Sequence, residues 1–90
     1  DGFYHGGNFV TLKEIADQAL EECPLVKHVI VTQYSHNPIS LQSGRDHWWH
    51  ELIEAQPETA ETERTGADDL LMLIYTSGTT GKPKGAMIWC

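Results

Sequence analysis

The sequence predicts an α/β fold, as a partial layered unit in which helix, strand, helix and strand follow one another and end in a glycine-rich loop. Three observations predict it: a helical period of apolar residues over 12–20, a β-branched run at 29–31, and an apolar run at 70–75 directly before the loop. A helix that leads into a buried strand implies an earlier strand upstream of Asp1. Because the chain also lacks an initiator Met, we expect an internal fragment of a larger domain.

The first predicted helix follows a loop at residues 1–8, which are rich in glycine and polar residues. Thr11 opens the helix, because its side chain can cap free backbone N–H groups and Glu14 completes a Thr-x-x-Glu capping box. Pro24 ends it. One face is apolar and the opposite face is polar or charged: the apolar residues are Leu12, Ile15, Ala16, Ala19 and Leu20, and the others are Lys13, Glu14, Asp17, Gln18, Glu21 and Glu22.

The run at 29–31 is too short for a helix and predicts a buried strand. A second helix is predicted from about Arg45 to Gln56, with Ser43 and Asp46 as a capping pair and Pro57 as its end. Four large apolar residues share one face of this helix, and we expect them in the core rather than as a stacking platform: Trp48, Trp49, Leu52 and Ile53.

Residues 57–69 contain five acidic residues and one arginine without any apolar period, and they predict a solvated connector. The apolar run at 70–75 predicts a buried strand of the parallel kind, and a second apolar stretch at 86–90 follows the loop. The chain is therefore expected to be one fragment with three parts: helix–strand–helix at 1–56, the acidic connector at 57–69, and a strand with its loop at 70–90.

The charge balance excludes two classes of partner. Six Lys and Arg against thirteen Asp and Glu give a net charge of -7, which repels nucleic acid and anionic membranes, so we expect neither as a partner. The longest apolar run is far shorter than the ~20 residues that span a bilayer. Two cysteines without metal-ligand spacing favour a reducing compartment, and we expect a cytoplasmic protein.

The most informative segment alternates hydroxyl residues with glycines and places two lysines around a proline: Thr76, Ser77, Gly78, Thr79, Thr80, Gly81, Lys82, Pro83 and Lys84. Glycines let the backbone come close to a ligand, and successive N–H groups in such a turn form a concave anion nest. Hydroxyl groups add donors, and lysines supply point charge for a polyphosphate. The segment therefore predicts a phosphate-binding loop that follows a strand at the carboxyl edge of a sheet.

The spacing excludes two common nucleotide loops. A Walker A loop has four residues between its first glycine and Gly-Lys-Ser/Thr, whereas Gly78 lies three residues before Gly81 and Pro83 follows Lys82. The dinucleotide fingerprint Gly-x-Gly-x-x-Gly is absent as well. A flexible surface loop without a ligand is the alternative to a phosphate-binding loop.

Several other residues carry structural predictions. His47 and His50 lie three residues apart, but no third ligand with suitable spacing follows, so we expect no metal site. Arg45 and Asp46 are expected to anchor the loop before them to the helix. Cys23 precedes a proline at a helix end and is expected to be a small buried hydrophobe rather than a nucleophile.

The string YTSGTTGKPKG, from Tyr75 to Gly85, resembles the signature of the acyl- and aryl-adenylate-forming synthetases. The upstream strings DGFYHGGNFVTLKEIADQAL, CPLVKHVIV and SGRDHWWHELI follow one another at the spacing of the acetyl-CoA synthetases and their short-chain relatives. The string from Gly44 to Trp49 is typical of the acetyl and propionyl branch. The resemblance covers nearly all 90 residues.

The resemblance implies an AMP-forming ligase that uses ATP with Mg2+, acetate and CoA, and that makes acetyl-CoA, AMP and pyrophosphate through acetyl-adenylate. It implies that Lys84 offsets the charge of the departing pyrophosphate. It also implies a CoA contact, for which only Gly7 of the pattern is kept, because His5 and Asn8 occupy the places of arginines. The implied ATP phosphate-binding residues are Thr76, Ser77, Gly78, Thr79, Thr80, Gly81, Lys82 and Lys84.

In the family that the chain resembles, the acyl pocket and the catalytic lysine lie downstream of the segment that ends at Cys90. The segment is therefore expected to contain no catalytic residue, to be inactive alone and to require the remainder of the parent chain. Two alternatives stay open: a ligase of the same superfamily for propionate or acetoacetate, and a non-catalytic nucleotide- or phosphate-binding module.

Overall fold

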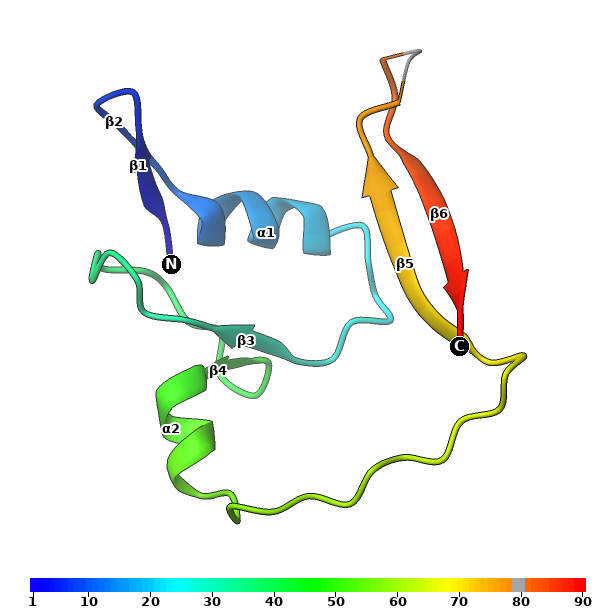
Figure 1. Ribbon diagram of the computed structural model, residues 1–90. Coiled ribbons are helices and arrows are strands. Elements are labelled where there is room, and N and C mark those ends of the chain that lie inside the picture. The colour runs from blue at the N-terminus through cyan, green and yellow to red at the C-terminus, as the bar shows by residue number, and fades with distance from the viewer. Residues whose placement is uncertain (79–80) are drawn as a thin grey trace. The chain divides into compact units, whose positions relative to one another are not determined.

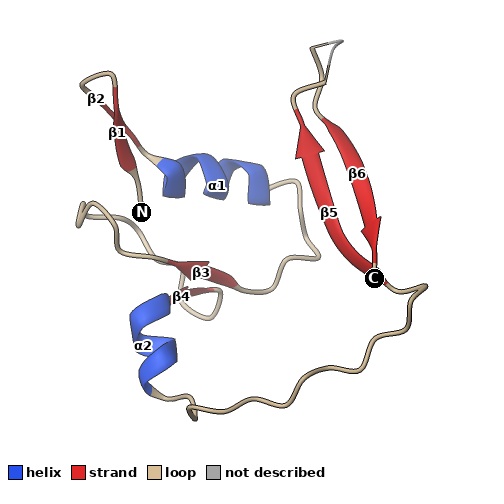
Figure 2. Cartoon of the chain, viewed as in Figure 1, coloured by secondary structure: helices blue, strands red, loops and turns tan. Residues whose placement is uncertain are grey.

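The computed structural model describes residues 1–78 and 81–90, and Figure 1 follows the chain through them. The chain divides into two compact units, Asp1–Glu58 and Thr59–Cys90. Both helices and strands are present, which confirms the predicted mixed α/β content (Figure 2). The strands form three two-stranded sheets.

The first unit contains four short strands and two helices: β1 (Phe3–His5), β2 (Asn8–Val10), α1 (Leu12–Leu20), β3 (Val29–Val31), β4 (Asp46–Trp48) and α2 (Trp49–Glu54). The second unit contains β5 (Leu70–Thr76) and β6 (Lys84–Trp89). Strand β1 pairs antiparallel with β2, β3 pairs parallel with β4, and β5 pairs antiparallel with β6.

The prediction of a loop over residues 1–8 is wrong, because this segment forms the β1–β2 hairpin. His5 and Asn8 are register partners, so Gly6 and Gly7 are the two residues of the turn. Both have positive φ, 56° and 82°, which is what a tight hairpin turn of the primed type requires. The Gly-Gly pair between two short runs that contain aromatic residues was the sequence signal for this hairpin.

Helix α1 begins after Thr11, as predicted, but the Thr11 side chain makes no capping hydrogen bond. The capping box is therefore not formed. Lys13, on the charged face of α1, is buried and only 5% exposed, while Leu12 and Ile15 on the apolar face are exposed. Lys13 is the one buried residue of α1, because it finds carboxylate partners there, whereas Glu14 and Gln18 on the same charged face are exposed.

The strand at 29–31 is confirmed as β3, although only Val31 is buried and Ile30 is exposed.

The second helix is shorter than predicted. It begins at Trp49, because residues 46–48 pair with β3 as the parallel strand β4. Asp46 therefore does not cap a helix, and Trp49 is about half exposed rather than in a core.

A cluster of four charged side chains connects α1 to the start of β4: Lys13, Asp17, Arg45 and Asp46. Lys13 Nζ lies 2.8 Å from both Asp17 Oδ2 and Asp46 Oδ2. Arg45 Nη2 lies 2.6 Å from Asp17 Oδ1 and donates to Asp46 Oδ2 at 2.9 Å. Arg45 and Asp46 therefore bond to each other and to α1, whereas the sequence predicted that they anchor the preceding loop to the second helix.

Asp46 is the centre of this four-charge cluster, since its side chain is completely buried. Besides the two cations, it accepts a hydrogen bond from the backbone N–H of Gln42 at 2.8 Å. The hydrogen bond from Arg45, followed by those from Lys13 and Gln42, lowers the pKa of the Asp46 carboxyl well below its usual range despite burial. Burial opposes the charge on Lys13, but its bonds to Asp17 and Asp46 raise the pKa of its ammonium group.

This pKa shift predicts loss of stability in acid. Because the folded-state pKa of Asp46 lies below the unfolded value of about 3.9, its contribution is complete above that pH and is lost as the pH falls through the folded pKa. Urea unfolding at about pH 6, 4 and 2.5 is expected to show a falling midpoint below about pH 4. The Asp46→Asn variant is expected to show a weaker dependence, and an unchanged dependence would contradict this assignment.

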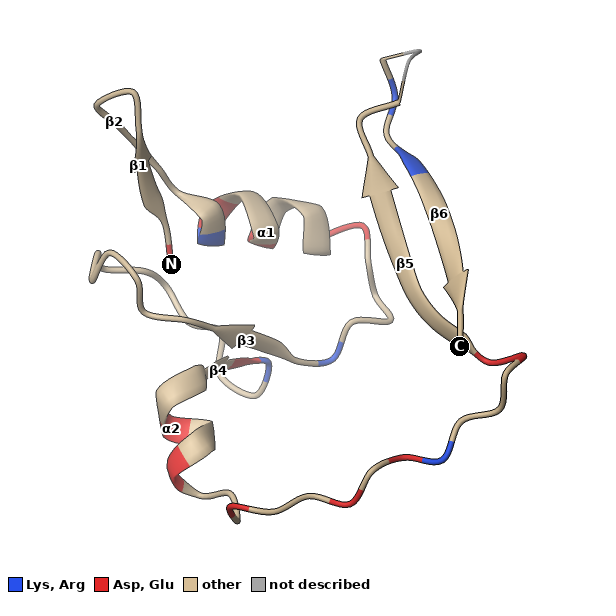
Figure 3. Cartoon of the chain, viewed as in Figure 1, with Lys and Arg blue, Asp and Glu red and all other residues tan. Residues whose placement is uncertain are grey.

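The second unit begins with an exposed segment at residues 59–69 that forms no helix or strand and carries four acidic residues and one arginine (Figure 3). The apolar run at 70–75 is confirmed as a strand, but β5 is neither parallel nor buried, because it pairs antiparallel with β6 and every residue of both strands is exposed. The seven residues at 77–83 are too few for a parallel crossover, which needs a dozen or more, so the chain turns back as a hairpin.

Within residues 1–78 and 81–90, neither helix has the length and the apolar character that crossing a membrane requires.

Candidate functional site

The predicted phosphate-binding segment connects β5 to β6 at one end of the hairpin. Thr76 ends β5, Lys84 begins β6, and these two residues are register partners. The structure therefore brings the first hydroxyl residue and the last lysine of the motif side by side. Thr79 and Thr80, which the motif also includes, lie outside the described residues.

Two glycines give this loop its shape. Gly78 and Gly81 have φ of +63° and +84°, in the left-handed region that favours glycine. A Cβ placed on Gly78 would lie 2.8 Å from the carbonyl oxygen of Lys82, whereas a Cβ on Gly81 would meet nothing within 4 Å. The backbone at Gly78 thus lies against the second half of the loop, and only a residue without a side chain fits there.

The two lysines of the loop are exposed. In the described part of the chain, neither Lys82 nor Lys84 lies within 4.0 Å of a carboxylate oxygen. Their ammonium groups are therefore available for an external anion. Together with a positive-φ backbone and the hydroxyl groups of Thr76 and Ser77, they provide the donor types that a polyphosphate binds.

The difference between the two glycines predicts a graded effect. If the loop binds the phosphates of ATP, as the sequence predicts, Gly78→Ala is expected to weaken ATP use by the full-length protein more than Gly81→Ala, because the first adds a clash to the strain of positive φ and the second adds strain alone. The KM for ATP in pyrophosphate exchange, measured for both variants, provides the comparison. Equal effects would show that the Gly78–Lys82 approach has no role in shaping the loop.

Gly7, the residue predicted to contact CoA, lies in the turn of the β1–β2 hairpin. It is exposed, and a Cβ built on it would meet nothing within 4 Å. Gly7 belongs to the first unit and the loop of Thr76 to Lys84 belongs to the second.

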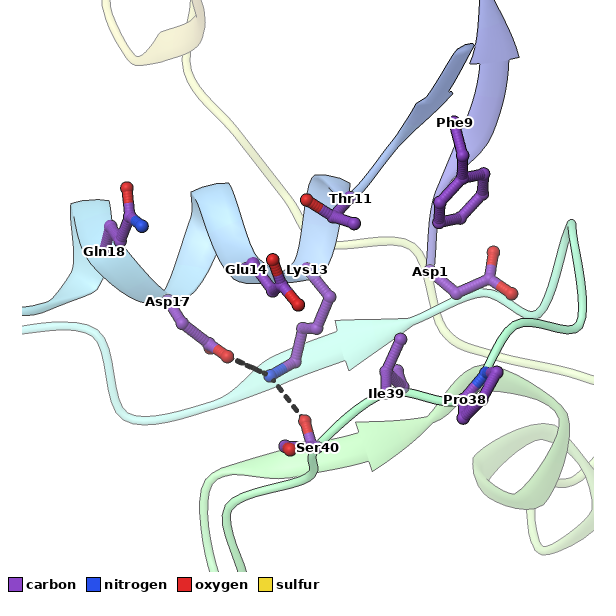
Figure 4. A pocket seen from close by; sticks show the side chains of 10 residues that line it. All are labelled: Asp1, Phe9, Thr11, Lys13, Glu14, Asp17, Gln18, Pro38, Ile39 and Ser40. Carbon is purple, nitrogen blue, oxygen red and sulfur yellow. Dashed lines mark hydrogen bonds and ion pairs between the residues drawn. The ribbon is translucent and has the colours of Figure 1, made fainter. Parts of the chain in front are cut away.

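The first unit contains a cavity of about 490 Å³ beside α1, shown in Figure 4. Lys13 donates to Asp17 and to the Ser40 carbonyl oxygen at one side of it, and Phe9 and Ile39 supply apolar surface. Of the predicted site residues that the structure describes, none lines this cavity. Two of its lining residues, Lys13 and Asp17, belong to the four-charge cluster.

The structure corrects the prediction for Cys23 and shows a histidine contact that the sequence did not predict. Cys23 is exposed, so its prediction as a buried hydrophobe is wrong. His47 does not pair with His50 but lies against His28, with His28 Nδ1 3.1 Å from His47 Nε2. Sequence reasoning missed His28 because it lies 19 residues earlier, and only the pairing of β3 with β4 brings the two rings together.

Comparison with known protein families assigns the chain to one enzyme family. A family model described as AMP-binding enzyme matches residues 8–89, which is nearly the whole chain and includes the described loop residues. The chain therefore belongs to the AMP-binding enzyme family.

The chain is also similar to curated members of the family that share one more specific name. The chain is 49% identical over 82 residues to an acetyl-coenzyme A synthetase of Nostoc linckia, which covers 91% of this chain and 24% of that relative. It is 50% identical to the acetyl-coenzyme A synthetase of Chromobacterium violaceum, over 89% of this chain and 12% of the relative. The one from Gemmatimonas aurantiaca is 45% identical over 94% of this chain and 14% of its own length. The chain thus spans a quarter or less of the length of these relatives.

Proposed function

We propose that this chain is part of the large amino-terminal adenylation domain of an AMP-forming acetyl-CoA synthetase, and that its β5–β6 loop binds the phosphates of ATP. The activity of the longer ligase is the conversion of acetate, ATP and CoA to acetyl-CoA, AMP and pyrophosphate through acetyl-adenylate. The observation that carries the proposal is the loop itself, where two positive-φ glycines and two unpaired lysines, as far as the structure describes them, follow directly on a strand.

The chemistry of the loop fits this role. Transfer at phosphorus depends on positioning and on charge stabilisation more than on covalent help from the protein. Backbone N–H groups near Gly78 and Gly81, with the hydroxyl groups of Thr76 and Ser77, would hold the β- and γ-phosphates. Lys82 and Lys84 would offset the charge that builds up on the departing pyrophosphate, and Mg2+ bound by the phosphates would share that charge.

The acid and the thiol are assigned through the relatives. The three relatives described above are named acetyl-coenzyme A synthetases, which supports acetate as the acid and CoA as the acceptor. Within this chain, Gly7 is the one residue that we propose near CoA. The exposed turn of the β1–β2 hairpin would let a nucleotide approach the backbone closely there.

The decisive experiment is exchange of radiolabelled pyrophosphate into ATP by the full-length protein with a panel of acids. We expect exchange with acetate to exceed exchange with propionate and acetoacetate. A clear preference for one of the other two acids would transfer the assignment to a different ligase of the superfamily. Absence of exchange with every acid, together with tight ATP binding, would indicate a nucleotide-binding module and contradict the proposed function.

A further inference from the structure

A pair of histidines lies outside the phosphate-binding loop, on the paired strands β3 and β4. His28 immediately precedes β3, and His47 is the middle residue of β4. Their facing ring nitrogens, His28 Nδ1 and His47 Nε2, are 3.1 Å apart, and the ring planes are inclined by 44°. We propose that this His28–His47 pair is a binding site for a divalent transition-metal ion of the kind that imidazole favours, namely Zn2+, Ni2+ or Cu2+.

The separation of the two nitrogens suits a shared metal ion. Imidazole nitrogens bind zinc at about 2.0–2.1 Å, so two nitrogens 3.1 Å apart would subtend an angle of about 95–100° at the metal. That angle lies between the right angle of a tetragonal site and the tetrahedral angle, both of which these ions adopt. The ion would lie beside the line that joins the nitrogens, in a direction about 40° from that line at each nitrogen, so both rings would pivot to direct their lone pairs at the ion.

The protons balance without any further reactant. In the metal-free pair, one nitrogen carries a hydrogen and donates it to the other. When the metal binds, that hydrogen moves to the opposite nitrogen of its own ring, so both facing lone pairs point at the ion. Each imidazole stays neutral, and no net proton is released from the pair.

The backbone fixes the two rings next to each other. Val29, directly after His28, donates its N–H to the Arg45 carbonyl oxygen at 2.8 Å, and Ile30 is the register partner of His47. The pair lies on the solvent side of the strands, while Asp46 faces inward to the four-charge cluster. A bound ion would therefore reach the nitrogens from solvent and would connect β3 to β4.

The proposed site has two protein ligands, and this number determines how firmly it would hold a metal ion. In the described residues, no three His, Cys, Asp or Glu side chains gather where they could hold a metal ion. Water would complete the coordination, so the ion would exchange with solvent rather than remain as a permanent structural metal. The consequence is a reversible stabilisation of the folded chain that grows with metal concentration.

Titration of the 90-residue chain with Ni2+, followed by NMR of the histidine rings and by calorimetry, tests this proposal. We expect the His28 and His47 ring signals to broaden first, and His28→Gln or His47→Gln to weaken binding by about tenfold or more. The matched control is His50→Gln, since His50 stacks on Trp48 and is not one of the pair. It is expected to bind Ni2+ as the unchanged chain does.

Two results would overturn the proposal. One is preferential broadening of His5, His36 or His50 in the unchanged chain, which needs no variant and so does not depend on the folding of a mutant. The other is equal Ni2+ affinity in the unchanged chain and in His47→Gln, with circular dichroism showing that both are folded.

Discussion

Replacement of Lys84 by alanine in the full-length protein is expected to slow acetate-dependent ATP–pyrophosphate exchange by about a hundredfold, the usual effect of losing one preorganised charge-stabilising group. Lys84 begins β6 opposite Thr76, so its stem is held by the hairpin register while its ammonium group is exposed beside the loop. Loss of the charge would raise the barrier to pyrophosphate departure without removing the strand that carries the residue. Exchange rates at saturating ATP and acetate measure this effect.

Two further variants make the Lys84 experiment specific. Lys27→Ala is the matched control, because Lys27 is exposed and its Nζ donates only to the nearby Pro24 carbonyl oxygen among the contacts described. It is expected to leave exchange unchanged. Lys84→Arg keeps the charge and is expected to recover part of the rate. If Lys84→Ala exchanged at the rate of Lys27→Ala, the proposed role of Lys84 would be wrong.

Replacement of Asp46 by alanine is expected to lower the free energy of unfolding of the 90-residue chain by about 3–5 kcal/mol. The change removes a fully buried carboxylate. The two cations that it contacts, the buried Lys13 and Arg45, then share Asp17 as their acidic partner. Urea unfolding followed by circular dichroism gives the difference.

Glu54→Ala is the matched control for Asp46→Ala, since Glu54 is an exposed carboxylate at the end of α2. Its effect is expected to be within about 0.5 kcal/mol. Hydrogen exchange of the Val29 amide, which bonds to the Arg45 carbonyl oxygen, reports the same loss locally. A similar stability for the two variants would mean that the four-charge cluster does not hold β4 to α1.

Local patterns predicted several elements correctly. The apolar period gave α1, the β-branched run gave β3, and the contiguous apolar run gave β5. The acidic segment without a period was correctly predicted to be an exposed connector. These features depend on residues near one another in the chain, and hydrophobic period and charge report them directly.

Contacts between distant residues account for two of the errors. Residues 46–48 belong to a helical pattern locally, but pairing with β3 draws them into a strand and delays the start of α2 until Trp49. Lys13 of α1 is buried because Asp46, 33 residues later, provides a carboxylate partner for it, as Arg45 does a cationic partner for Asp17. The i, i+4 spacing of Lys13 and Asp17 was visible in the sequence, but their burial was not.

The sequence by itself determined where a phosphate-binding loop is predicted, because glycines, hydroxyl residues and lysines in one short segment are the residue types that such a loop needs locally. Only the tertiary structure decided which charges are buried and which rings meet, as in the four-charge cluster and the His28–His47 pair. Both depend on strand pairing between segments far apart in the chain, and no local pattern of residues encodes which segments will pair.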